Sequence, residues 1–164
     1  MEAIIRKRKK EDAQELAHAI ATVWNDTYKG IVNEEFLNNL FNYENDSAEK
    51  IKKHIVDQPN YYILEINNRI AGWIYFELDS DKYEDAAEIH SLYILKEYQG
   101  KGYGKKLYNF AVDMIKKNKI EKLVIGCLDG NKSNDFYKHI GGKYIKSGLF
   151  RDEYKENYYL FNLF

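Results

Sequence analysis

Proline and cysteine are almost absent from this chain of 164 residues, which has one of each, Pro59 and Cys127. A single cysteine excludes an internal disulfide and any metal or redox motif built on paired cysteines. No proline-, glycine- or serine-rich stretch separates parts of the chain, and no repeat is present. We therefore expect residues 1–164 to form a single domain.

Long apolar runs and an excess of one charge are also missing. No apolar stretch reaches the roughly 18 residues of a membrane span, and the first residues lack the apolar core of a signal peptide. Lys and Arg (25) balance Asp and Glu (26) to a formal charge of -1. We therefore expect no nucleic-acid or membrane partner, a solvated basic run at Arg6–Lys10, and a cytoplasmic location.

Apolar periodicity predicts the secondary structure of a globular chain rich in aromatic residues. Apolar residues at three- and four-residue spacing predict helices, and alternating or continuous apolar runs predict strands. The expected helices cover residues 13–30, 33–40, 47–56, 107–115 and 134–140. The expected strands cover residues 3–6, 61–66, 70–78, 87–95, 123–128, 143–149 and 154–161.

The connections between these elements predict the fold class. A strand, a glycine turn, a helix and a strand follow one another over residues 87–128, which implies one parallel strand pair. The turn pair Asn67-Asn68 joins two strands as an antiparallel hairpin. The expected class is α+β with a mixed, mostly antiparallel sheet.

Three alternating glycines, Gly100, Gly102 and Gly104, precede the fourth expected helix. Glycine allows the backbone to approach a ligand closely, and the first turn of a helix offers N–H groups to an anion. Phosphate is therefore the expected ligand. The alternative is a glycine-rich connector that binds no ligand. The P-loop motif fails at Lys106, and the dinucleotide fingerprint fails at Lys105.

The whole stretch resembles the acetyl-CoA motif of the GNAT superfamily of N-acetyltransferases. The family pattern is a strand, then Gln/Arg-x-x-Gly-x-Gly/Ala, then a helix, and Gln99, Gly102 and Gly104 match it. Lys96 stands where many relatives have proline. The resemblance implies a loop that holds the CoA pyrophosphate and a strand that pairs with the pantetheine arm. The implied cofactor residues are Leu92, Tyr93, Ile94, Gln99, Gly100, Lys101, Gly102, Tyr103, Gly104, Lys105 and Asn131.

A second stretch, residues 130–142, looks like the later motif of the same family, an Asn followed by a helix with Phe-Tyr and a Gly-Gly turn. By this resemblance Asn131 lies beside the pantetheine and Tyr137 protonates the departing CoA thiolate. The alternative for Tyr137 is a plain core residue. The family fold, which has helices on both faces of the sheet, would span nearly the whole chain.

A softer match covers the acceptor side. The stretch from Trp24 through Tyr28 to Ile31 is similar to one that lies between the first two helices of many bacterial members. That region usually walls the acceptor site in the family. The resemblance therefore implies Trp24, Tyr28 and Ile31 as substrate-binding residues.

Acetyl transfer to an amine requires a proton acceptor, because only about one alkyl amine in 10³ is neutral at pH 7. The candidates for this base are Glu88 and His90, which are two residues apart on an expected strand and so share a face. A surface or hydrogen-bonded histidine without a catalytic role is the alternative for His90. The resemblance favours Glu88 as the base, with a backbone N–H near Ile94 polarising the carbonyl. The four histidines show no metal-ligand spacing, so acetyl-CoA is the expected cosubstrate and no metal is expected.

The function that these patterns predict is an acetyl-CoA-dependent N-acetyltransferase. The acetyl group would move directly to a primary amine of a small molecule, peptide or protein, because no activated nucleophile is visible. A non-catalytic acetyl-CoA sensor and a phosphate-binding interaction domain are the alternatives. The aromatic residues of the last strand are expected in the core, and any exposed remainder would suit a homodimer interface.

Overall fold

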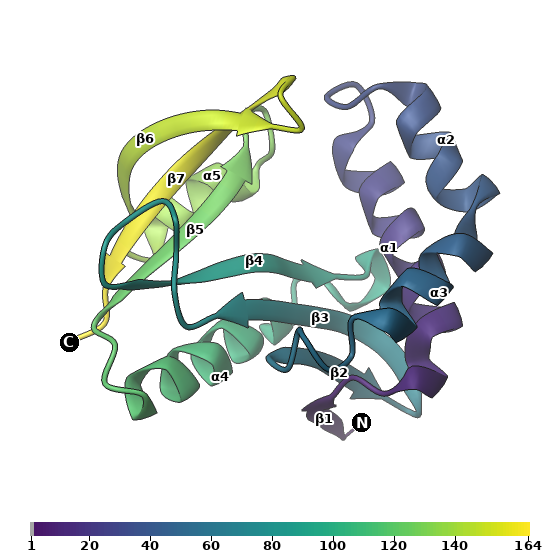
Figure 1. Cartoon of the computed structure of the whole chain (residues 1–164), viewed down its shortest axis with the longest axis horizontal. Coiled ribbons are helices and arrows are strands. Elements are labelled where there is room, and N and C mark those ends of the chain that lie inside the picture. The colour runs from purple at the N-terminus through teal and green to yellow at the C-terminus, as the bar shows by residue number, and fades with distance from the viewer. Residues whose placement is uncertain (1) are drawn as a thin grey trace. The chain divides into compact units, whose positions relative to one another are not determined.

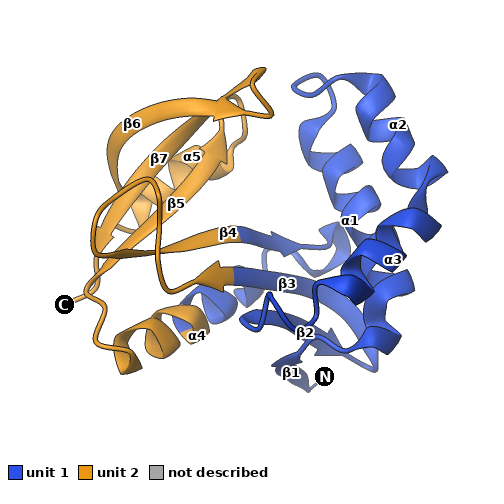
Figure 2. Cartoon of the chain, in the orientation of Figure 1, with its two compact units in different colours: residues 1–75, 91–109 blue, residues 76–90, 110–164 orange. Residues whose placement is uncertain are grey.

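The computed structural model describes residues 2–164 and divides into two compact units (Figures 1 and 2). Unit 1 comprises residues 1–75 and 91–109, and unit 2 comprises residues 76–90 and 110–164. The chain passes from one unit to the other inside strand β3 (Arg69–Glu77), strand β4 (Ala86–Ile94) and helix α4 (Tyr103–Lys117). Hydrogen bonding joins the strands in the order β1-β2-β3-β4-β5-β7-β6.

Unit 1 contains an antiparallel meander and the first helices. Strand β1 (Ala3–Lys7) pairs with β2 (Tyr61–Ile66), and β2 pairs with β3. The expected turn at Asn67 and Asn68 is confirmed, since both residues have positive φ. The helices are α1 (Ala13–Tyr28), α2 (Glu34–Asn42) and α3 (Glu44–Lys53).

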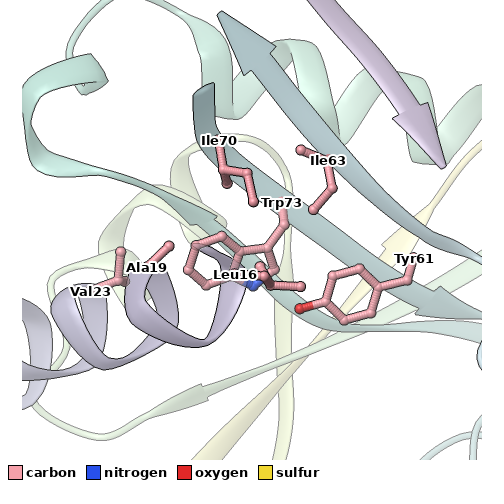
Figure 3. Close-up of a cluster of buried hydrophobic side chains, with 7 residues drawn as sticks. All are labelled: Leu16, Ala19, Val23, Tyr61, Ile63, Ile70 and Trp73. Atoms are coloured by element: carbon pink, nitrogen blue, oxygen red, sulfur yellow. The ribbon is translucent and has the colours of Figure 1, made fainter. Parts of the chain in front are cut away.

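Helix α1 packs its apolar side on β2 and β3. Figure 3 shows Leu16, Ala19 and Val23 of α1 with the side chains of Tyr61, Ile63, Ile70 and Trp73. Tyr93 of β4 packs against the same cluster. Its neighbour Ile94 points to the other face, where it lies next to Gly104 in the first turn of α4. Helices therefore cover both faces of the sheet in this unit, as expected.

The expectation that Arg6–Lys10 is solvated is wrong for its two arginines. Arg6 forms ion pairs of 2.8 Å with Asp12 and with Glu65. Arg8 is buried, and its guanidinium lies 3.9 Å from the centre of the Tyr61 ring. Carboxylates pair with the half-buried Arg6, and an aromatic ring packs against the buried Arg8, which the sequence pattern alone did not reveal.

Unit 2 contains the parallel pair and the C-terminal hairpin. Strand β4 runs parallel to β5 (Lys122–Leu128), which confirms the expected parallel connection. Strand β7 (Tyr154–Asn162) pairs antiparallel with β5 and with β6 (Lys143–Phe150), and helix α5 spans Ser133–His139. The tail aromatics Tyr158, Tyr159 and Phe161 are buried as expected, and Phe164 is exposed. The possible homodimer stays a prediction.

Candidate active site

The glycine turn lies in unit 1 between a 3-10 turn at Lys96–Tyr98 and helix α4. Gly100 and Gly102 have φ of +74° and +84°, and no atom lies within 4 Å of a Cβ built on either. Glycine is thus required there by the left-handed backbone and not by crowding. The helical hydrogen bonding of α4 begins with the Lys106 N–H, which donates to the Gly102 carbonyl. The amides of Tyr103, Gly104 and Lys105 precede this bond, so they have no acceptor within the helix.

A side-chain hydrogen bond joins this turn to the preceding strand. The Gln99 side-chain amide donates to the Ile94 carbonyl at 2.9 Å. On the other side of the strand, a Cβ on Gly72 would lie 2.5 Å from the Tyr93 carbonyl oxygen. The strand end at Tyr93 and Ile94 is therefore held between a glycine of β3 and the first residue of the family motif.

The expected acceptor residues lie in unit 1, and two of them belong to an aromatic cluster with β4. The rings of Trp24 and Tyr28 are 4.5 Å apart, and the Tyr28 hydroxyl lies 2.7 Å from the Tyr93 hydroxyl. Ile31 is half-buried, and its amide donates to the Tyr28 carbonyl. The fold thus brings the expected acceptor wall against a residue expected to bind the cofactor, through a hydroxyl pair that the sequence did not reveal.

Glu88 lies in unit 2 and is buried. Ser80 donates a hydrogen bond of 2.5 Å to its Oε1, and the Lys82 amide donates to Ser80 Oγ at 3.0 Å. His90 Nδ1 lies 3.2 Å from Glu88 Oε2. The structure therefore confirms that Glu88 and His90 share a face, and it adds a serine from the loop between β3 and β4.

A second carboxylate lies on the same sheet face, and the sequence pattern did not reveal it. Burial raises the pKa of Glu156, which also feels the charge of Glu88. Burial and the nearby Glu156 also raise the pKa of Tyr158. A Cβ on Gly126 would meet the Glu156 carboxylate at 3.0 Å, so the glycine makes room for that group. The position of Glu156 could have been predicted only from the strand register, which places Gly126 opposite Tyr158.

Tyr137 and Asn131 lie at helix α5 in unit 2. Asn131 Oδ1 accepts a hydrogen bond of 2.9 Å from the Ser133 amide, which fixes the turn into the helix. Tyr137 is buried, and its ring centre lies 6.3 Å from that of Tyr159. The Tyr159 hydroxyl in turn donates to Asn134 at 2.7 Å. Tyr137 therefore rests on a hydrogen-bonded support between α5 and β7.

The strand register places Glu88 and Tyr137 on opposite faces of the unit 2 sheet. Glu88 pairs with Val124 and Val124 with Leu160, and directly paired side chains share a face. Tyr159 is the residue next to Leu160 in β7, and its ring contacts that of Tyr137. Since successive residues of a strand alternate between faces, the two expected catalytic side chains approach the sheet from opposite sides.

Three further observations concern the cysteine thiol, metal binding and membrane-spanning helices. Burial and the nearby Glu156 carboxylate raise the pKa of the Cys127 thiol to about 12. Among residues 2–164, no group of three His, Cys, Asp or Glu side chains could hold a metal ion. Within the same described range, no helix has both the length and the apolar character needed to cross a membrane.

The sequence matches the model of a known protein family. Residues 17–141 match the model of the Acetyltransferase (GNAT) family, which is well over half of the chain. A spermidine N(1)-acetyltransferase of Thermoplasma acidophilum is 33% identical over 121 residues, covering 71% of this chain and 72% of that protein. The chain belongs to the GNAT family of acetyltransferases. The expected class of enzyme, an acetyl-CoA-dependent N-acetyltransferase, is thereby confirmed.

Other relatives support the fold. The PaiA N-acetyltransferase of Thermoplasma acidophilum, solved in complex with coenzyme A, matches with a TM-score of 0.78 at 24% identity. That match covers 96% of this chain and 98% of the solved chain. An uncharacterized N-acetyltransferase of Methanocaldococcus jannaschii is 26% identical over 90 residues, or 52% of this chain, which span 39% of that protein. The expected α+β fold with a mixed sheet is confirmed.

Proposed function

We propose that this protein transfers the acetyl group of acetyl-CoA directly to a primary amine, without an acetyl-enzyme. The glycine turn before α4 is the observation that carries the proposal. Its two left-handed glycines and the first-turn amides of Tyr103, Gly104 and Lys105 suit a pyrophosphate. Lys101 and Lys105 are exposed beside the turn and add positive charge.

The remaining expected cofactor residues suit the pantetheine arm. Leu92, Tyr93 and Ile94 form the strand end that Gln99 holds through the Ile94 carbonyl. Asn131 lies in the turn that opens α5. In this proposal a backbone N–H near Ile94 polarises the thioester carbonyl, as an oxyanion donor does in acyl transfer.

The reaction needs two proton transfers, one from the amine and one to the leaving sulfur. Acetyl-CoA, when bound, supplies a thioester whose carbonyl carbon accepts the amine and whose C–S bond breaks. The amine loses a proton to a base on the face shared by Glu88 and His90, and Tyr137 donates its hydroxyl proton to the leaving sulfur. A tyrosine of ordinary pKa near 10 can protonate a thiolate whose thiol has a pKa near 8.5, although not strongly.

The proposed acceptor is a primary amine. The relatives indicate the chemical class of this acceptor but do not identify it. The relative that is 33% identical is named for spermidine, so spermidine is the first acceptor to try. Trp24, Tyr28 and Ile31 are the proposed residues of the acceptor wall.

Calorimetry and a thiol-release assay test the proposal. Acetyl-CoA and CoA are titrated into the wild-type protein and into Gly102→Glu, whose carboxylate would stand at the proposed phosphate site. Thiol release is then followed with spermidine, free amino acids and a peptide with a free N-terminus. The high pKa of Cys127 keeps the protein's own thiol silent in this assay.

Micromolar acetyl-CoA binding that the variant loses, together with turnover on one amine, is the expected result. Absence of binding by both compounds would contradict the proposal and leave the glycines as a plain connector. Binding without turnover on any amine would favour the non-catalytic acetyl-CoA sensor.

A further inference from the structure

Both oxygens of the Glu88 carboxylate already have partners. Ser80 Oγ donates to Oε1 at 2.5 Å, and His90 Nδ1 lies 3.2 Å from Oε2. Only 7% of the Glu88 side chain is exposed. A carboxylate enclosed in this way is poorly placed to receive a proton from an amine that enters from solvent.

His90 is the outer member of this chain of contacts, with 34% of its side chain exposed. An ionised carboxylate only accepts hydrogen bonds, and Glu88 Oε2 is closer to the ring (3.2 Å from Nδ1) than Glu77 Oε1 is (3.6 Å from Nε2), so the neutral imidazole is expected to carry its hydrogen on Nδ1. The lone pair is then on Nε2, which lies 3.6 Å from Glu77 Oε1. Nε2 and Glu77 thus place a proton acceptor next to a negative charge, which is the environment that an ammonium group requires.

We propose that His90 is the catalytic residue that accepts the acceptor amine's proton, and that Glu88 is a positioning residue that orients the imidazole. Glu77 attracts the ammonium group to Nε2. One N–H bond of the ammonium breaks, its proton moves to Nε2, and the nitrogen lone pair becomes available to attack the thioester carbon. His90 then releases the proton to water. This inference rests on the proposed function.

The charges around His90 favour a cation on this face of unit 2. Carboxylates reach it from its own strand and from three other places in the unit. They belong to Glu77 of β3, Asp81 of the β3–β4 loop, Glu88 of β4 and Glu156 of β7. Lys82 is an opposing charge that interacts with Glu88 and Glu156, and it pairs with Asp81. The same carboxylates stabilise the imidazolium that proton transfer creates.

The tautomer of His90 tests the positioning role without any substrate. Ring ¹⁵N chemical shifts are measured by NMR in the wild-type protein and in Glu88→Gln, near pH 8. The wild-type ring is expected to carry its hydrogen on Nδ1. The amide that replaces the carboxylate can donate as well as accept, so the variant is expected to lose that preference. A wild-type ring with its hydrogen on Nε2, or one unchanged in the variant, would overturn the proposal.

The pH profile tests the catalytic role. With the best acceptor of the amine panel, His90→Ala is expected to lower kcat/KM by about 10²- to 10³-fold. The acid limb of the profile that reports His90 should vanish, and imidazole in the buffer should restore part of the rate. Glu88→Gln should keep an acid limb, although shifted. His54→Ala is the matched control, because its ring lies at the surface of unit 1, 2.9 Å from the exposed carboxylate of Asp57.

Calorimetry with acetyl-CoA distinguishes a failure of this inference from a failure of the proposed function. If His90→Ala binds acetyl-CoA and keeps the wild-type pH profile, this inference is wrong and the proposed function stands. The same conclusion follows if Glu88→Gln loses the acid limb while His90→Ala retains it. A wild-type protein that neither binds acetyl-CoA nor acetylates any amine overturns the proposed function, and the catalytic role of His90 with it.

Discussion

At the residue scale, the hydroxyl of Tyr137 is the group most directly open to test. Tyr137→Phe keeps the ring that packs near Phe136 and Tyr159, and removes only the proposed proton donor. We expect kcat to fall about 10²-fold, because a positioned general acid typically contributes 10²–10⁴-fold. The KM for acetyl-CoA should stay the same. Steady-state kinetics under saturating amine measure both constants.

The matched control for this substitution is Tyr43→Phe. Tyr43 lies at the junction of α2 and α3, and 56% of its surface is exposed. Removal of the Tyr43 hydroxyl should leave kcat unchanged. An unchanged kcat in Tyr137→Phe as well would remove Tyr137 from the mechanism and return it to the role of a core residue.

The buried thiol of Cys127 gives a second residue-scale prediction. Its pKa of about 12 leaves about one thiolate in 10⁴ molecules at pH 8, and the thiolate is the reactive species. Iodoacetamide at pH 8 should therefore leave the native protein unmodified and alkylate it rapidly in guanidinium chloride. Mass spectrometry counts the adducts. Fast modification of the native protein would contradict the burial of Cys127.

The same raised pKa fixes the sign of a pH effect on stability. The unfolded thiol loses its proton near pH 9, whereas the folded thiol keeps it until about pH 12. Folding thus binds more protons in this interval, and the free energy of unfolding should fall as the pH rises through it. Other groups also titrate there, so Cys127→Ala, which removes this contribution, should show a smaller fall in urea denaturation.

Residue identities predicted part of the candidate site and missed its non-local part. Glu88 and His90 share a face because they are two apart on one strand, which the sequence shows directly. Ser80 donates a hydrogen bond to Glu88 from a loop, and Glu156 of β7 interacts electrostatically with Glu88. Such contacts depend on the strand register and the path of the loop, and neither is written in local spacing.

At the element scale, the end of β4 depends on a glycine in the neighbouring strand. A Cβ on Gly72 would lie 2.5 Å from the Tyr93 carbonyl oxygen and 2.7 Å from an Ile94 side-chain atom. We expect Gly72→Ala to destabilise the protein by about 1–3 kcal/mol, the usual cost of overpacking. Binding of acetyl-CoA should also weaken, because the displaced segment is the proposed pantetheine strand. Thermal unfolding and calorimetry measure the two effects.

Gly104→Ala is the contrasting variant in the same unit. Gly104 has no positive φ, and its Cβ would lie 3.9 Å from Ile94, an ordinary contact. Alanine is also a better helix former than glycine, so stability should be equal or higher. Equal stability losses in both variants would show that the close approach at Gly72 is not what limits this strand.

The sequence predicted most elements, and its errors have local causes. The N-cap role of Asn33 is confirmed, because its side chain accepts from the Glu35 and Phe36 amides. The helix expected over 47–56 instead spans Glu44–Lys53, so its first turn holds Glu44 and Asp46 and its last turn holds lysines. This charge order suits the helix dipole, and it outweighs the weak apolar pattern of that segment.

At the scale of the whole molecule, the two units are unusual in how they share the chain. Each is discontinuous in sequence, and the crossings fall inside β3, β4 and α4 and not in linkers. Domains that fold separately are normally joined through exposed, flexible segments. This arrangement favours the prediction of one domain over residues 1–164, and therefore one cooperative unfolding transition.

The chain carries a natural probe in each unit for that prediction. Trp24 and Trp73, the chain's 2 tryptophans, belong to unit 1, and Cys127 belongs to unit 2. In a urea titration, tryptophan fluorescence reports unit 1 and pulsed alkylation of Cys127 reports unit 2. We expect the two midpoints to coincide, because neither unit can unfold without breaking strands and a helix that it shares with the other. Exposure of Cys127 at a urea concentration where tryptophan fluorescence is still native would instead divide the chain into two domains.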